Sequence, residues 1–98
     1  MQINQKKENE KMTYAIAGRI DTLTAPALEA AINALDADIR DLVLDMTDVE
    51  YISSAGLRVL LAAQKKMSKI GTLKLIGVCD AVMEVFEMTG FADILVIE

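Results

Sequence analysis

Apolar and polar side chains alternate along residues 12–18 (MTYAIAG), a period of two that predicts a strand ending at Gly18. Residues 41–46 (DLVLDM) have a continuous apolar centre between charged ends, which is typical of a strand buried on both faces. The segments 72–78 and 93–98 are rich in aliphatic residues and bounded by glycine or charge. Each of these segments therefore predicts one strand.

Apolar residues recur at three- and four-residue spacing in three other segments, which predicts helices. The first follows Thr24, a residue suited to cap a helix N-terminus. The others cover about 55–69 and 80–89, with Gly71 and Gly90 just beyond their ends. The residues expected to face the core are Leu28, Ala31, Ile32, Leu35, Leu57, Leu60, Leu61, Val82, Val85 and Phe86.

Strands and helices thus alternate along the chain, which favours parallel pairing through right-handed crossovers. The prediction is a single α/β domain covering 1–98, with a mostly parallel sheet of four to five strands and about three main helices. Residues 1–11 are polar and are either weakly ordered or a short edge strand over Met1–Gln5. In the second case that strand would be an antiparallel edge.

The composition narrows the partners that this domain could have. Hydrophobic residues make up 53% of the chain and aromatic residues only 4%, so the core must be aliphatic. The net charge of -5 disfavours nucleic acid and anionic membrane surfaces as partners. No apolar run is long enough for a membrane span, and no signal-peptide pattern opens the chain. These features predict a cytoplasmic protein.

The chain contains no histidine and a single cysteine, Cys79. Ser-His-Asp and Cys-His catalysis, and most zinc sites, are therefore excluded. A magnesium site at Asp45, Asp48 and Glu50 is a weak alternative to solvated acidic residues. We predict a non-enzyme with no catalytic residue, no metal site and no cofactor.

Polar residues follow two of the predicted strands, at the edge where α/β sheets form their sites. Asp21 follows strand 12–18. If the strand at 41–46 is its neighbour, the loop after that strand brings further polar residues to the same edge. These are Thr47, Asp48, Glu50, Ser53 and Ser54.

The two serines have two interpretations. Either hydroxyl could cap the following helix, a contact worth about 1 kcal/mol. Alternatively, one serine is a phosphate acceptor, because a helix N-terminus tolerates a phosphate without unfolding. The added charge of about -1.5 to -2 would change the surface seen by a partner. The residues alone leave both interpretations open.

The chain resembles the STAS domain family, and in particular the bacterial anti-sigma factor antagonists. The resemblance lies in residues 18–28 (GRIDTLTAPAL) and, most specifically, in residues 42–61 (LVLDMTDVEYISSAGLRVLL). Residues 71–78 and 85–97 match the closing half of the family. The resemblance implies the same order of strands and helices.

The resemblance implies a function as well. In the regulatory members, the serine two residues before the Gly-Leu pair is phosphorylated by a partner anti-sigma factor that is an ATP- and magnesium-dependent serine kinase. That serine is Ser54 here, with Ser53 as the alternative acceptor. The unphosphorylated antagonist binds the kinase and frees a sigma factor, and a serine phosphatase reverses the modification. The expected partner-binding residues are Asp21, Thr47, Asp48, Glu50, Tyr51, Ser53, Ser54, Gly56 and Arg58.

An alternative function stays open. STAS-like domains also occur as constitutive scaffolds or as accessory subunits of signalling and transport complexes. Such a role would need no phosphorylation switch, and its partner would not be a kinase.

Overall fold

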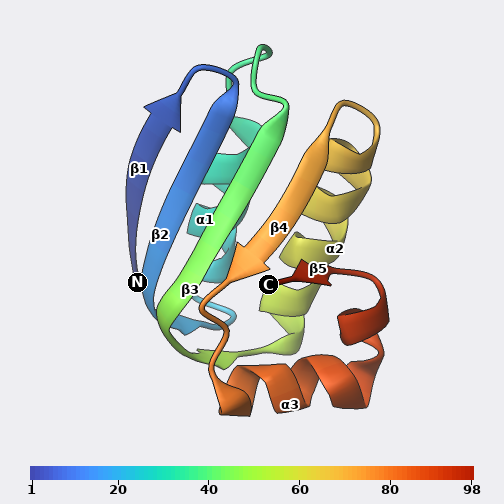
Figure 1. The fold of residues 1–98 in the computed structure, drawn as a ribbon. Helices are drawn as coiled ribbons and strands as arrows, with labels where there is room; N and C mark the ends of the chain where they lie inside the picture. Colours follow the sequence, from blue (N-terminus) through green and yellow to red (C-terminus); the bar gives the residue numbers. More distant parts are fainter.

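One sheet of five strands, in the order β1-β2-β3-β4-β5, organises the fold (Figure 1). The computed structural model describes residues 1–98. β1 pairs antiparallel with β2, and every other neighbouring pair is parallel. The strands are β1 (Gln2–Glu8), β2 (Lys11–Ile20), β3 (Asp41–Ile52), β4 (Thr72–Ile76) and β5 (Val96–Ile97). The predicted α/β class, with an antiparallel first strand, is confirmed.

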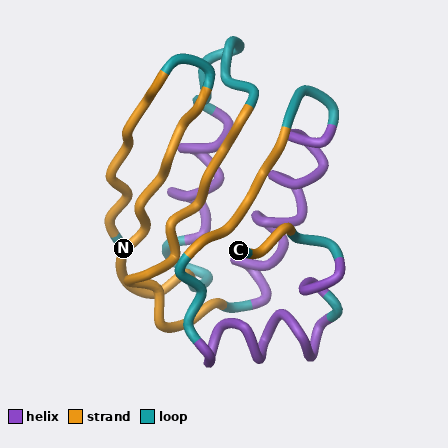
Figure 2. Tube along the Cα trace, viewed as in Figure 1, coloured by secondary structure: helices purple, strands orange, loops and turns teal.

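The helices cover only one face of this sheet. α1 and α2 lie behind it in Figure 1, and α3 crosses its lower end, which Figure 2 shows in the same view. A short 3-10 helix, η1, connects α3 to β5. The elements are α1 (Ala25–Asn33), α2 (Ser54–Ser68), α3 (Asp80–Thr89) and η1 (Phe91–Asp93). The fold therefore has two layers, and the second face of the sheet has no helix on it.

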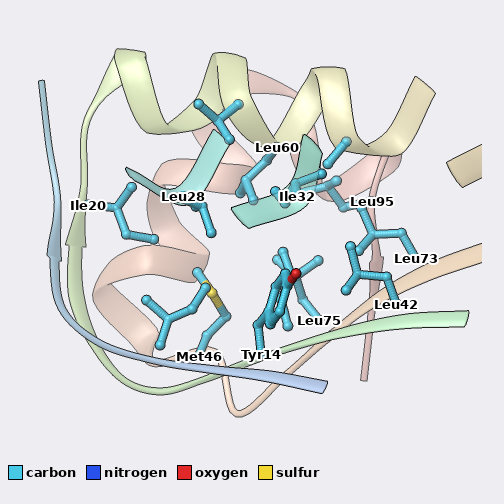
Figure 3. Packing of buried hydrophobic residues seen from close by; sticks show 14 of the residues in the cluster. Tyr14, Ile20, Leu28, Ile32, Leu42, Met46, Leu60, Leu73, Leu75 and Leu95 are labelled. Atoms are coloured by element: carbon cyan, nitrogen blue, oxygen red, sulfur yellow. The ribbon is translucent and has the colours of Figure 1, made fainter. Parts of the chain in front are cut away.

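The core lies between the sheet and the helices α1, α2 and α3 (Figure 3). Alternate residues of the strands point into it, and the helices contribute their apolar faces. The buried tyrosine Tyr14 adds a polar anchor, because its hydroxyl donates a 2.7 Å hydrogen bond to the carbonyl oxygen of Ala31 in α1. Burial raises the pKa of Tyr14 above its ordinary value.

The apolar centre of β3 is buried on both sides, as predicted, although no helix covers one of them. Val43 faces away from the helices, yet it is only 3% exposed. Its neighbours in register are Thr13 of β2 and Lys74 of β4. Lys74 is held by an ion pair with Glu98 at 3.5 Å, so neighbouring side chains shield Val43 where a helix is absent.

β1 is longer than the predicted edge strand Met1–Gln5. It pairs with β2 from Gln2 opposite Ala17 to Glu8 opposite Lys11. Backbone hydrogen bonds make this pairing, so polar side chains do not prevent it.

Several other bounds differ from the sequence predictions. β2 does not end at Gly18 but continues to Ile20, and the last strand is limited to Val96–Ile97 because η1 takes up part of 93–98. Within α2, Leu61 is half-buried, and Val59 is a buried residue that the prediction did not include. Three more residues expected in the core, Ala31, Leu35 and Val85, are half-buried.

The largest correction concerns β3, which extends to Ile52 instead of ending at residue 46. Its register against β2 shifts twice, once between Asp45 and Asp48 and once between Val49 and Tyr51. Each shift is a bulge that adds one residue to β3. The buried positions Met46, Val49 and Ile52 are consequently three residues apart, and a period of two is lost.

Candidate functional site

The ends of β2 and β3 meet at the lower edge of the sheet in Figure 1, beside the start of α2. Arg19 lies opposite Tyr51 and Ile20 opposite Ile52. The backbone N–H of Ser53 then donates a 2.8 Å hydrogen bond to the carbonyl oxygen of Ile20. These two strands are therefore neighbours in the sheet, as the sequence analysis supposed, and the segments that follow them leave the sheet side by side.

The two serines have different environments. Ser53 is the N-cap of α2 and half-buried, and its Oγ accepts a 3.3 Å hydrogen bond from the backbone N–H of Gly56. Ser54 is the first residue of α2; it is exposed, and its hydroxyl has no hydrogen-bond partner in the structure. The capping role thus belongs to Ser53, and Ser54 is free for another role.

Gly56 lets α2 approach the ends of both strands. A Cβ atom at this position would lie 2.7 Å from Cγ2 of Ile20 and 2.7 Å from Cγ1 of Ile52. Real Cβ atoms do not approach that closely, so any larger residue would push the first turn of α2 away from the sheet. Because Gly56 is buried, we assign it a packing role and leave it out of the exposed surface.

The carboxylate of Asp21 is largely occupied by the turn before α1. Its Oδ1 accepts hydrogen bonds from the backbone N–H groups of Leu23 at 3.0 Å and Thr24 at 3.1 Å. Together with the nearby guanidinium of Arg19, these bonds lower the pKa of Asp21, and the bond from the Thr24 backbone is the largest cause.

Thr24 occupies the predicted N-cap position of α1, but its side chain does not cap the helix. The Thr24 hydroxyl instead accepts from the backbone N–H of Asp21 at 2.8 Å and donates to the carbonyl oxygen of Arg19 at 2.7 Å. Asp21 and Thr24 therefore hold each other at the end of β2.

Arg19 links Asp21 to the neighbouring strand. Its Nε lies 3.8 Å from Oδ2 of Asp21, and its guanidinium stacks 4.1 Å from the centre of the Tyr51 ring. Such stacking is worth about 0.5–1 kcal/mol at an exposed site. Tyr51 is 40% exposed, so the aromatic ring remains accessible beside this ion pair.

The sequence analysis placed Thr47, Asp48 and Glu50 in a loop at this edge, and the structure does not. All three are exposed residues of the extended β3. Asp48 pairs in register with Ala17, and the Thr47 hydroxyl donates to Asp45, so these two lie further back along the strand, away from Ser54. The bulges explain the difference, because they allow a segment without strand periodicity to remain paired.

β3 extends past the carboxyl end of β4. In this extended part, β3 lies next to β2 on one side and to the start of α3 on the other. β4 ends at Ile76, which pairs with Asp45, and further along β3 the thiol of Cys79 donates a 3.4 Å hydrogen bond to the carbonyl oxygen of Val49. This contact gives Cys79 a structural role at the start of α3.

Arg58 lies one helical turn after Ser54 in α2, and it lines a hollow of about 300 Å³ between α1 and α2. The hollow has Glu29 as its only acidic lining residue and a mainly apolar floor that includes Ala25, Ala55 and Val59. Arg58 is exposed and forms no hydrogen bond or ion pair in the structure.

Leu23 was missed by the sequence reasoning. It lies in the turn after Asp21 and is 89% exposed, more than any other large apolar residue in the chain. The sequence did contain a signal for this residue: a leucine between Thr22 and Thr24 that fits neither a strand pattern nor a helix pattern. Leu23 follows the end of β2 and Tyr51 lies near the end of the neighbouring β3, so two exposed large apolar residues belong to this edge of the sheet.

A larger hollow, of about 430 Å³, lies on the uncovered face of the sheet. Three of its four charged groups are already engaged, since Lys74 pairs with Glu98 and the Thr72 hydroxyl donates to Asp41, whereas Lys11 has no such partner. Size alone therefore does not make it the better candidate. No helix of the structure combines the length and apolar character needed to cross a membrane.

Comparisons with known proteins agree with the fold of the chain. The model of the STAS domain family matches residues 2–98. A putative anti-sigma factor antagonist, BtrV of Bordetella bronchiseptica, is 36% identical over 96 residues, covering 96% of this chain and 83% of that protein. The anti-sigma-B factor antagonist of Listeria monocytogenes is 32% identical over 97 residues, covering 96% and 84% of the two chains.

A solved structure is similar along the whole chain. The anti-sigma factor antagonist from Mycobacterium paratuberculosis superposes with a TM-score of 0.87 at 30% identity. The match covers 98% of this chain and 83% of the other.

Proposed function

The chain belongs to the STAS domain family, and we propose that it is an anti-sigma factor antagonist whose binding is switched by phosphorylation of Ser54. In its unphosphorylated form it binds an anti-sigma factor that is a serine kinase, and so releases a sigma factor in the cytoplasm. The kinase transfers phosphate from ATP, with magnesium, to Ser54 and thereby ends the interaction. A serine phosphatase restores the binding form. The domain itself performs no catalysis.

The division of roles between the two serines carries this proposal. Ser53 accepts the capping hydrogen bond, so Ser54 can be modified without loss of the cap. Ser54 is also exposed, which a kinase requires of its acceptor. The names of the two relatives described above support the same function for the chain as a whole.

A phosphate at Ser54 would change the charge of the edge and leave the fold intact. Dianionic phosphate is compatible with the first turn of a helix, where backbone N–H groups are unpaired. Asp21 already brings one carboxylate to this edge, and Glu50 lies on the adjoining strand. The modified surface would repel an acidic partner group that the unmodified surface accepts.

The accessible residues of this edge form the proposed partner surface. They combine two apolar groups with charged ones, as binding surfaces commonly do. The members are Asp21, Leu23, Tyr51, Ser54 and Arg58, with Thr47, Asp48 and Glu50 as an outer part on β3. Ser53 and Gly56 are not part of this surface; they fix the start of α2, the helix that contains Ser54 and Arg58.

The test compares four baits: wild type, Ser54→Ala, Ser54→Asp and Ser53→Ala. Proteins retained from an extract of the native cell are identified by mass spectrometry, and a retained kinase is purified and incubated with each bait, ATP and Mg²⁺. We expect Ser54→Ala to bind without being phosphorylated. Ser54→Asp should lose at least about tenfold in affinity, equivalent to about 1.4 kcal/mol.

Ser53→Ala is the matched control, because it removes the neighbouring hydroxyl. This variant should still be phosphorylated at Ser54 and should still bind the kinase. Phosphorylation of Ser54→Ala, or equal affinity of wild type and Ser54→Asp, would contradict the proposal. Equal retention of one non-kinase partner by all four baits would support a constitutive scaffold instead.

A further inference from the structure

Two arginines lie near Ser54, and only one of them is engaged. Arg19 is held by the Asp21 carboxylate at 3.8 Å and by the Tyr51 ring at 4.1 Å. Arg58 has no such partner, although Glu29 lines the same hollow. Arg58 is therefore an arginine of this edge whose guanidinium is free to take an anion.

The position of Arg58 on α2 directs it toward Ser54. The two residues are four apart in one helix, so their side chains share a face with Cβ atoms about 5–6 Å apart. Helical side chains tilt toward the N-terminus, which inclines Arg58 across the turn that Ser54 begins. An acidic residue followed four positions later by a basic one is also the favourable order for a helical ion pair.

We propose that the guanidinium of Arg58 binds the phosphate of phosphorylated Ser54. This inference rests on the proposed function in one respect, the choice of Ser54 as the acceptor. A guanidinium can bind two phosphate oxygens at once, which makes arginine better suited than lysine to this contact. Neither residue has to break an existing hydrogen bond or ion pair in order to form it.

The pairing gives the switch a second part. Without phosphate, Arg58 stands at the hollow between α1 and α2, where an acidic group of the partner kinase can reach it. With phosphate, the same guanidinium is turned toward Ser54. Phosphorylation thus adds negative charge to the partner surface and removes a positive charge from it at the same time.

The test uses the full chain with phosphoserine incorporated at position 54 during translation, so it requires no kinase. The pKa of the phosphate, which is about 6 for a free phosphoserine, is followed by phosphorus NMR. Arg58→Gln should raise this pKa by about 0.5, the size expected for an exposed ion pair. Arg58→Lys should give an intermediate value.

Other charged groups belong to the elements around Ser54 and have to be held constant. They are Arg19 and Asp21 at the end of β2, Glu50 on β3 and Glu29 on α1, and all are retained in every variant. Lys65→Gln is the matched control, because it removes one exposed cation from the same helix two turns further on. Its phosphate pKa should equal that of the wild type.

A second readout observes Arg58 directly. In the phosphorylated wild type, the side-chain N–H signal of Arg58 should shift with the titration of the phosphate, and in the unphosphorylated chain it should not. Equal phosphate pKa values for Arg58→Gln and Lys65→Gln would overturn the pairing. If the protein fails to bind a kinase, the proposed function is contradicted. The two NMR measurements would still test the pairing of Arg58 with the phosphate, because they need no kinase.

Discussion

The backbone N–H of Ser53 donates a 2.8 Å hydrogen bond to the carbonyl oxygen of Ile20, and this bond sets the geometry of the site. Asp21 follows directly after the acceptor residue, and Ser54 follows directly after the donor. Two residues that are 33 positions apart in sequence (54 minus 21) therefore leave the sheet next to each other.

The two serines should differ in their effect on stability. Ser53→Ala removes the capping oxygen and should lower the free energy of unfolding by about 1 kcal/mol. Ser54→Ala removes an exposed hydroxyl with no partner and should change it by no more than about 0.5 kcal/mol. Urea unfolding of both variants measures the difference, and equal losses would show that Ser53 is not the cap.

Gly56→Ala should destabilise the protein although alanine is the better helix former. Helix propensity alone favours alanine over glycine by about 1 kcal/mol. The added Cβ would meet Ile20 and Ile52 at 2.7 Å, and overpacking of this kind costs about 1–3 kcal/mol. Chemical denaturation gives the net effect, and Ala62→Gly, at an exposed position of α2, gives the propensity contribution separately.

Asp21 should contribute stability that is lost in acid. Hydrogen bonds from the turn lower its pKa below the ordinary value of 3.8, so the folded state favours the charged carboxylate. This contribution is complete above the ordinary pKa and disappears as the pH falls through the lowered pKa. Asp21→Asn should therefore be less stable than wild type at pH 6, and the gap should close as the pH approaches 2.

Urea unfolding at a series of pH values measures that gap. Asp48→Asn is the control, since it removes the same charge from a carboxylate without a hydrogen-bond partner. A gap that stays constant from pH 6 to pH 2 would mean that the effect of Asp21 does not depend on its charge.

Tyr14→Phe should lower the free energy of unfolding by about 1–2 kcal/mol. The change leaves the ring in place but removes the 2.7 Å hydrogen bond to Ala31, which leaves a partly buried carbonyl oxygen without this donor. Thermal or chemical unfolding measures the loss. A neutral result would indicate that water replaces the hydroxyl.

Leu23→Ala should weaken binding of the proposed partner without affecting the fold. Leu23 is 89% exposed, so its truncation removes no core contact, whereas full burial of a leucine side chain against a partner is worth about 1.5–3 kcal/mol. We expect about a tenfold loss of affinity in a titration with the purified kinase. Met88→Ala, at an 80% exposed position on α3, is the control and should bind as wild type does.

The fold was predictable because its strands and helices have distinct periods. Tyr14 and Ile16 alternate with smaller residues, and Leu57 and Leu60 recur at helical spacing, so both kinds of element are visible in the sequence. β1 was only partly predictable. Its antiparallel pairing comes from backbone groups, and its side chains contain little apolar signal beyond Ile3.

The site was predictable as a sheet edge but not in its details. Asp21, Ser53 and Ser54 are brought together as expected, because neighbouring parallel strands end at one edge. Thr47 and Asp48 were placed wrongly because the bulges in β3 space its buried residues three apart, a pattern that does not indicate a strand. Which serine caps α2 depends on a single hydrogen bond, and the sequence offers two equivalent hydroxyls for it.

The antiparallel course of β1 has a practical consequence for every binding experiment on this domain. Met1 lies against Gly18, where a Cβ atom would be 3.2 Å from the Met1 Cα, so the amino terminus emerges at the same edge as the site. An affinity tag or surface linkage joined there would crowd Asp21 and Ser54. Attachment through the Asn9–Glu10 turn, at the opposite end of the β1–β2 hairpin, leaves that edge open to a partner.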